Sequence, residues 1–285
     1  MANGKIGSIR VSPRGPRFEV LLKNENAKGC VFYGRQCNHC DIPTLGMGIN
    51  PKENQRLLVE DIVKLGDEKD LVKQVNLYGS GNVLSRIEIS DETFNFAITS
   101  MLMFRNLECI GIDSRPEIAI SRMGKERIEH ALYIISRTSI RFEVIVGYET
   151  QDVQLRTSEG GLHKMISEKH MEQVFQLAKE LGLGLQINVM LMPVPTMQLR
   201  DAVEEAVRTI ERVKELQNKF GVAFVLVNLH PLYITRRMLA KCGEGILSNP
   251  LPSHAEIQEV VSRCGRLLPI FVGLDDEGLS VKKDY

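Results

Sequence analysis

From residue 18 onward, short apolar runs alternate with amphipathic runs, and this pattern constrains the fold more than any other feature. The apolar runs read as seven buried strands at residues 18–22, 74–78, 107–112, 142–147, 185–191, 224–229 and 268–272. Between them apolar residues recur at helical spacing, as at Met171, Val174, Phe175, Ala178 and Leu181. Strands that alternate with helices predict repeated βαβ units and a parallel sheet.

Seven strands of this kind predict an α/β fold of the (β/α) TIM-barrel type. We expect a partial (β/α)6 barrel with an extra C-terminal strand, formed by a single domain over residues 1–285. Its core is expected at about 18–235, followed by a C-terminal extension at 236–285. An open doubly wound sheet is the competing architecture. The terminal run 280–285 is expected to be disordered.

The charge and apolar content of the chain narrow the functional classes. Lys and Arg number 36 and Asp and Glu number 36, so the formal net charge is zero. This disfavours a dedicated nucleic-acid binder without excluding one. No apolar run reaches about eighteen residues, so no membrane helix is expected. The N-terminal segment also lacks the apolar core of a signal peptide. With six cysteines in 285 residues, these features predict a reduced cytoplasmic protein.

Three cysteines lie close together after the first expected strand. Cys30, Cys37 and Cys40 are spaced as Cys-x6-Cys-x2-Cys. Thiolates are soft ligands that suit an iron–sulfur cluster or a zinc ion. Three of them can hold a four-iron cluster and leave one iron open to a substrate or cofactor. Structural zinc, with His39 or a distant residue as a further ligand, is the alternative.

Polar segments follow each of the other expected strands, where a barrel of this type places its chemistry. Each segment can also be an ordinary turn or a charged surface loop. We predict that the substrate is met by side chains after the fourth, sixth and seventh strands: Glu149, His230, Tyr233, Asp275 and Asp276.

On these motifs the chain resembles the radical S-adenosylmethionine (SAM) enzymes, whose first loop most commonly carries Cys-x3-Cys-x2-Cys. The second gap matches here and the first is longer. The turn Gly-Ser-Gly-Asn at 79–82 resembles the Ser-Gly-Ser turn of the branch with the archaeosine synthase radical subunit and the Elongator catalytic subunit. Asp-Ser-Arg-Pro-Glu at 113–117 resembles that branch's Glu-Thr-Arg-Pro-Glu. Gly-Tyr-Glu-Thr at 147–150 resembles its Gly-Leu-Glu-Thr, with Arg156 following.

The resemblance implies a [4Fe-4S] cluster on Cys30, Cys37 and Cys40, with SAM on the open iron. It implies that one electron reaches the sulfonium, releasing methionine and a 5′-deoxyadenosyl radical that takes a hydrogen atom from the substrate. An electron donor such as flavodoxin or ferredoxin is then needed. The cofactor contacts it implies are His39, Gly79, Ser80, Gly81, Asn82, Asp113, Arg115, Glu149 and Arg156.

The leading functional hypothesis is radical chemistry on a small polar substrate in cofactor or natural-product biosynthesis. It follows from the cysteine trio, the zero net charge and the absence of an added basic domain. A tRNA- or protein-modifying radical SAM enzyme is the nearest alternative. A zinc-stabilised binding protein without turnover is the alternative from another class.

Overall fold

The computed structural model describes residues 7–285. Residues 1–6 lie outside the described residues. They are the first residues of the expected single domain, and they belong to the N-terminal segment that is expected to lack a signal peptide. Two compact units make up the chain. The first comprises Met1–Val31, described from Gly7, together with Pro43–Ile145 and Glu180–Gly184, and the second comprises Phe32–Ile42, Val146–Lys179 and Leu185–Tyr285. The prediction of one domain stays a prediction.

The first unit is built on a hairpin followed by parallel strands. Its strands are β1 (Gly7–Ser12), β2 (Gly15–Leu22), β3 (Gln74–Gly79), β4 (Cys109–Asp113) and β5 (Arg141–Glu149), the last of which continues into the second unit. β1 pairs antiparallel with β2, and β2 to β5 pair in parallel. The helices are α1 (Pro51–Lys64), α2 (Asp91–Met101), α3 (Pro116–Ala119) and α4 (Arg122–Ile135).

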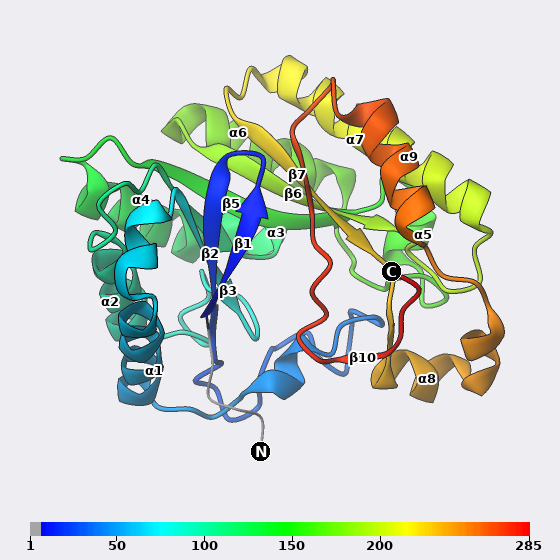
Figure 1. Ribbon diagram of the computed structural model, residues 1–285, viewed down its shortest axis with the longest axis horizontal. Coiled ribbons are helices and arrows are strands. Elements are labelled where there is room, and N and C mark those ends of the chain that lie inside the picture. The colour runs from blue at the N-terminus through cyan, green and yellow to red at the C-terminus, as the bar shows by residue number, and fades with distance from the viewer. Residues whose placement is uncertain (1–6) are drawn as a thin grey trace. The chain divides into compact units, whose positions relative to one another are not determined.

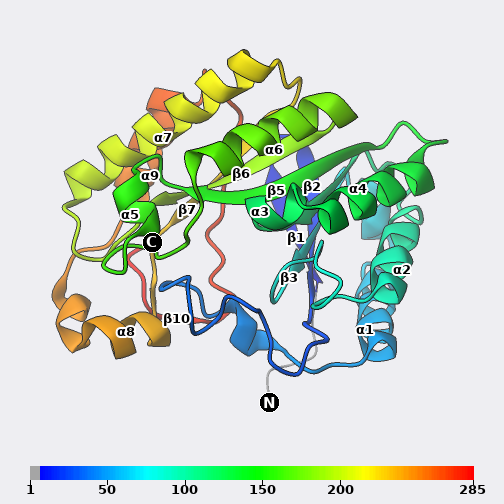
Figure 2. The ribbon, with the colours of Figure 1, turned by 180° about the vertical axis from the view of Figure 1, so that it is seen from behind.

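Local sequence sets the helix starts of this unit. The Asn50 side chain accepts the Glu53 N–H and so begins α1, and the Ser90 side chain accepts the Thr93 N–H and begins α2. α1 packs against α2, and α2 against α4 (Figure 1). Figure 2 shows the same three helices together from the opposite side.

The second unit continues the parallel pattern with β6 (Gly184–Leu191), β7 (Val225–Pro231) and β9 (Ile270–Val272). A separate antiparallel pair joins β8 (Ile234–Thr235) to β10 (Ser280–Lys282). The helices are α5 (Val153–Thr157), α6 (Glu168–Leu181), α7 (Leu199–Phe220), α8 (Arg236–Cys242) and α9 (His254–Cys264), and α7 packs beside α9 (Figure 1). Of the short 3₁₀ helices, Glu244–Ser248 lies in the second unit and Gly66–Leu71 in the first, while Ile42–Leu45 starts at the last residue of the second-unit segment Phe32–Ile42.

The order of the main sheet is β1-β2-β3-β4-β5-β6-β7-β9. The parallel strands therefore follow one another in chain order, as in a (β/α) barrel, and the reversal of order that defines a doubly wound sheet is missing among the described strands. The order and direction of the strands therefore confirm the expected α/β fold, with six βα repeats and an extra C-terminal strand. No helix within residues 7–285 is long and apolar enough to cross a membrane.

Two local expectations were incomplete or wrong. The hairpin strand β1 was not predicted, because its sequence, GSIRVS, shows no buried apolar face and Val11 is 89% exposed. The terminal run 280–285 is not disordered throughout, since Ser280 and Lys282 pair with Thr235 and Ile234. Backbone pairing with a strand distant in sequence orders this segment.

Candidate functional site

The cysteine loop is folded by local backbone hydrogen bonds. The Cys40 N–H donates to the Cys37 carbonyl at 3.2 Å, so the x2 gap is a closed turn, and Cys37 has a left-handed φ of 57°. In the longer x6 gap the Gln36 N–H donates to the Phe32 carbonyl at 2.8 Å. The three residues by which this gap exceeds the common x3 spacing are thus taken up by a second turn.

Residues distant in sequence hold this loop within the second unit. The Cys37 N–H donates to the His163 carbonyl at 3.1 Å. The Arg237 N–H at the start of α8 donates to the Asp41 carboxylate at 3.0 Å, and its guanidinium lies 4.6 Å from the centre of the Tyr33 ring. Such a cation–π contact adds to the hydrogen bonds. The C-terminal extension therefore anchors the loop that carries Cys37 and Cys40.

The cysteines of the loop differ from the others in exposure. Cys30, Cys37 and Cys40 are half-buried thiols, and Cys30 lies in the first unit while the other two lie in the second. Burial raises the pKa of the Cys109 thiol and raises that of Cys264 to about 11. Three accessible soft donors on one loop fit an iron–sulfur cluster in donor chemistry. Among residues 7–285, no three Cys, His, Asp or Glu side chains are gathered closely enough to hold a metal ion.

The glycine turn after β3 is fixed by its own side chains. The Ser80 hydroxyl accepts the Asn24 N–H at 2.7 Å and donates to the Gly46 carbonyl at 2.6 Å. The Asn82 side-chain oxygen accepts the Arg115 N–H at 3.0 Å, and its amide group donates to Glu88 at 3.0 Å. Both side chains are buried, and the backbone N–H groups of Ser80 and Asn82 donate to the Leu22 carbonyl and the Glu88 carboxylate. Contact of this turn with a cofactor stays a prediction.

The segment after β4 carries the other predicted cofactor contacts of the first unit. The Arg115 guanidinium lies 2.6 Å from Glu117, and Arg115 is 8% exposed. The Asp113 carbonyl accepts the Val83 N–H at 3.2 Å. The hydrogen bond from the Arg115 N–H to the Asn82 side chain thus joins the segment after β4 to the glycine turn after β3. Their contact with a cofactor stays a prediction.

Glu149 ends β5 in a strained conformation. Its φ is 67°, and the Thr150 N–H donates to the Tyr148 carbonyl at 2.9 Å, so Glu149 is the centre of a γ-turn. Its buried carboxylate lies 2.6 Å from the Lys164 ammonium. A Cβ on Gly147 would lie 2.4 Å from the Glu149 carboxylate, so glycine leaves room for this ion pair.

The charges around Glu149 come from three basic residues. Burial raises the pKa of its carboxyl group, but Lys164, His39 and His230 lower it, and the net pKa lies below its usual value. The His230 imidazole lies against the backbone of Gly273, where a Cβ would be 2.6 Å away. Two other predicted site residues, His39 and His230, are therefore near enough to Glu149 to act on its carboxylate.

A second group of predicted residues surrounds Tyr233. Burial raises the pKa of the Tyr233 hydroxyl, and the negative groups of Cys40, Tyr285 and Asp276 raise it further. The Asp276 carboxylate accepts from the Gly278 N–H at 2.9 Å and from the Ser280 hydroxyl, and it pairs with Lys283. Although burial opposes the shift, Lys283 and these donors lower the pKa of Asp276 to about 2. Asp275 is exposed.

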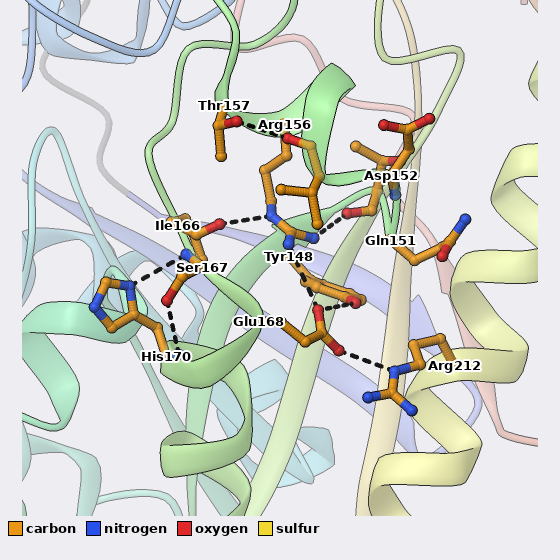
Figure 3. Close-up of polar contacts among 12 residues, drawn as sticks. Tyr148, Gln151, Asp152, Arg156, Thr157, Ile166, Ser167, Glu168, His170 and Arg212 are labelled. Atoms are coloured by element: carbon orange, nitrogen blue, oxygen red, sulfur yellow. Dashed lines mark hydrogen bonds and ion pairs between the residues drawn. The ribbon is translucent and has the colours of Figure 1, made fainter.

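Arg156 is enclosed by protein groups (Figure 3). Its side chain is 0% exposed, and its guanidinium lies 4.7 Å from the centre of the Tyr148 ring. It donates to the Ile166 carbonyl at 2.7 Å and lies 3.5 Å from Glu168. These contacts make it a support of the loop after β5, and its contact with a cofactor stays a prediction.

Three buried polar residues near these groups were missed from the sequence. They are Asn24, Glu88 and Lys164. Asn24 and Glu88 meet across the first unit, and Lys164 lies in a loop after α5. Glu88 offered one signal, because it is an acidic residue between Ile87 and Ile89, but an isolated acid beside apolar residues is not specific.

The comparisons with known proteins give distant similarities. No family model matches the chain. The uncharacterized protein MJ0550 of Methanocaldococcus jannaschii is 24% identical over 214 residues, which cover 71% of this chain and 53% of that protein. The chain thus spans about half the length of the curated relative it matches.

The solved structures similar to this chain include radical SAM enzymes. The methyltransferase TsrM from Kitasatospora setae, solved with cobalamin and a [4Fe-4S] cluster, has a TM-score of 0.43 and 14% identity over 76% of this chain and 37% of that chain. The cobalamin-dependent enzyme OxsB has a TM-score of 0.41 and 14% identity over 69% of this chain and 26% of its own. Spore photoproduct lyase has a TM-score of 0.41 and 9% identity, and the match covers 81% of this chain and 58% of that chain. TM-scores below 0.5 are too low to transfer a mechanism.

Proposed function

We propose that the chain is a radical SAM enzyme in which Cys30, Cys37 and Cys40 hold a [4Fe-4S] cluster. The observation that carries this is the cysteine loop, where three half-buried thiols occupy one loop and the Cys37–Cys40 gap forms a closed turn. When bound, the cluster would supply the electron that splits SAM into methionine and a 5′-deoxyadenosyl radical.

The remaining residues of the chain would bind and orient the cofactor and substrate. The backbone of the 79–82 turn is held in place by Ser80 and Asn82, so it can meet a polar ligand without rearranging. The Glu149 carboxylate, whose pKa is lowered, is ionised at neutral pH and would accept hydrogen bonds from hydroxyl or ammonium groups. His230 and Tyr233 would line the substrate side, together with Asp276.

The proposed substrate is a small polar metabolite, and the proposed electron donor is a flavodoxin or ferredoxin. The balanced charge of the chain supports a small substrate over a nucleic acid. Modification of tRNA or protein is the second candidate, supported by the motifs shared with the archaeosine synthase and Elongator branch. Retention of tRNA by the protein at low salt, lost as salt rises, would favour that second candidate.

Electron paramagnetic resonance on anaerobically reconstituted, dithionite-reduced protein tests the proposal. We expect a reduced four-iron signal that changes shape when SAM is added. Replacing Cys37 by Ala should abolish the signal, while replacing the exposed Cys242 by Ala should leave it unchanged. Zinc in place of iron and sulfide, with no cluster signal, would overturn the proposal and support the zinc-stabilised binding protein.

A further inference from the structure

Glu88 is a fully buried carboxylate, 0% exposed, between β3 and α2 of the first unit. One of its oxygens accepts the Asn82 backbone N–H at 2.8 Å and the Asn24 side-chain amide at 3.0 Å. The other accepts the Asn82 side-chain amide at 3.0 Å. A Cβ on Gly81 would lie 1.7 Å from this carboxylate, so the turn packs directly on Glu88.

The two asparagine amides can face Glu88 in one orientation only. The Asn82 oxygen accepts the Arg115 backbone N–H at 3.0 Å, and the Asn24 oxygen accepts the Asn26 backbone N–H at 2.8 Å. A backbone N–H needs an acceptor, so the NH₂ group of each asparagine must point at Glu88. Every group that touches the Glu88 carboxylate is therefore a donor, and residue 88 must accept on both oxygens.

Glu88 also binds the segment that leads from β2 to Cys30. Its carbonyl accepts the Glu25 N–H at 2.8 Å. Burial raises the pKa of its carboxyl group, and the donors of Asn82 and the backbone N–H of Val31 act in the opposite direction. One residue thus connects the segment before Cys30, the glycine turn and, through Asn82, Arg115.

We propose that Glu88 is a positioning residue that fixes the 79–82 turn and Arg115 for binding of SAM. The choice of SAM as ligand rests on the proposed function, whereas the coupling of Glu88, Asn82 and Arg115 rests on their contacts alone. Glu88 does not touch the ligand in this proposal, and it acts through the orientation of Asn82.

The variant Glu88→Gln exposes this coupling. Its NH₂ group would face a donor, from the Asn82 side chain, from the backbone of the turn or from the Val31 N–H. Asn82 could turn its amide around to accept from Gln, but its NH₂ group would then face the Arg115 N–H. Either way one buried hydrogen bond is lost, and we expect SAM to bind about tenfold more weakly.

A second substitution should restore the pattern. In Glu88→Gln with Asn82→Asp, one aspartate oxygen can accept from the new NH₂ group and the other from the Arg115 N–H. The glutamine oxygen still accepts the backbone N–H of residue 82 and the Asn24 amide. The single variant Asn82→Asp places two buried carboxylates together and should weaken binding. We expect the double variant to bind SAM within about threefold of the unmodified protein.

Glu143 provides a matched control in the same unit. It is also 0% exposed, but its carboxylate pairs with Arg14 at 2.5 Å and with Arg141 at 2.7 Å. Breaking a buried ion pair lowers stability. Glu143→Gln should therefore lower the melting temperature while leaving the affinity for SAM unchanged.

The experiment is calorimetric titration of SAM into the reconstituted variants, combined with amide hydrogen exchange on the chain without cofactor. Weaker binding in Glu88→Gln and recovery in the double variant support the proposal. The proposal is overturned if Glu88→Gln binds SAM with an affinity within threefold of that of the unmodified protein. It is also overturned if the double variant does not fold or does not regain affinity for SAM. If the unmodified protein holds no cluster and binds no SAM, the proposed function fails. Hydrogen exchange at the Arg115 backbone amide then still tests the coupling of Glu88, Asn82 and Arg115. The coupling requires exchange that is faster in Glu88→Gln than in the unmodified protein, and slower in the double variant than in Glu88→Gln.

Discussion

Two buried glutamates, one in each unit, show how neighbours set the role of a carboxylate. Glu88 is 0% exposed, and the groups that donate to its carboxylate within residues 7–285 are amide N–H groups. Glu149 is 6% exposed and lies 2.6 Å from the Lys164 ammonium, with His39 and His230 also close enough to act on it. Burial raises the pKa of both groups, and it prevails at Glu88, while the cations prevail at Glu149 and lower its pKa.

This difference in neighbours suits Glu88 to holding backbone segments in place and Glu149 to meeting a ligand. Glu88 binds groups whose own orientations are fixed by backbone N–H donors, and so it locks loops together. Glu149 lies in a strained turn, a feature that clusters at functional sites, and its charge is matched by side chains. The four predictions below test this contrast.

Removal of the ammonium beside Glu149 should have the largest effect. Lys164→Met leaves a buried carboxylate without its main counter-charge, and we expect the free energy of unfolding to fall by about 3–5 kcal/mol. Urea denaturation measures it. The double variant Lys164→Met with Glu149→Gln should recover most of the loss, because neither charge remains. A loss below about 1 kcal/mol in Lys164→Met would show that the two histidines suffice.

A side chain added at Gly81, beside Glu88, should have the second-largest effect on stability. A Cβ at Gly81 meets the Glu88 carboxylate at 1.7 Å and the Asn24 amide at 2.6 Å, and both are held by other hydrogen bonds. We expect Gly81→Ala to lower the free energy of unfolding by about 1–3 kcal/mol. Gly160→Ala is the control, because nothing lies within 4 Å of its Cβ position. Equal melting temperatures for the two variants would contradict a rigid Glu88.

The two glutamates should give stability slopes of opposite sign with pH. The lowered pKa of Glu149 contributes stability above its usual value of 4.5 that is lost as pH falls. Glu88, whose pKa is raised, binds its proton more tightly in the native state, so its contribution is lost as pH rises above 4.5. Between about pH 4 and 7, the unfolding free energy lost in Glu149→Gln should grow, and that lost in Glu88→Gln should shrink. Parallel curves would refute the contrast.

An accessible ion pair should give the smallest effect. Lys283 lies 2.8 Å from Asp276, but its side chain is 36% exposed, whereas that of Lys164 is 11% exposed. We expect Lys283→Ala to cost less than about 1 kcal/mol of unfolding free energy in the same urea assay. The Ser280 hydroxyl and the Gly278 N–H still hold the Asp276 carboxylate. A cost equal to that of Lys164→Met would mean that burial does not distinguish the two pairs.

Much of the fold could be predicted because periodicity is local. All seven expected strands are present, and the boundaries differ by a few residues, as where the run 142–147 extends to Arg141–Glu149. The misses were β1, β8 and β10, which are short or carry no strong apolar pattern. Each is ordered by hydrogen bonds to a partner strand, and such pairing leaves little trace in the segment itself.

The loops that carry the candidate site residues could be predicted from the sequence, but the residues that contact them in the fold could not. Spacing and placement after a strand pointed to Cys37, Cys40 and Glu149. The resemblance implies a cofactor contact at Ser80, and the structure adds that its hydroxyl is hydrogen-bonded to Asn24 and Gly46; the cofactor contact stays a prediction. Exposure depends on what packs over a residue, which spacing does not report.

The sequence by itself determined the alternation of strands and helices and the loops that carry polar groups, because apolar periodicity and strand ends follow from neighbouring residues. The order of the strands in the sheet came from the tertiary structure, because pairing joins residues distant in sequence. Only the tertiary structure decided which carboxylate meets amides and which meets cations. Asn24 and Glu88 are 64 positions apart, and Glu149 and Lys164 are 15 apart. Their electrostatics depend on distances of a few ångströms that exist only once the chain has folded.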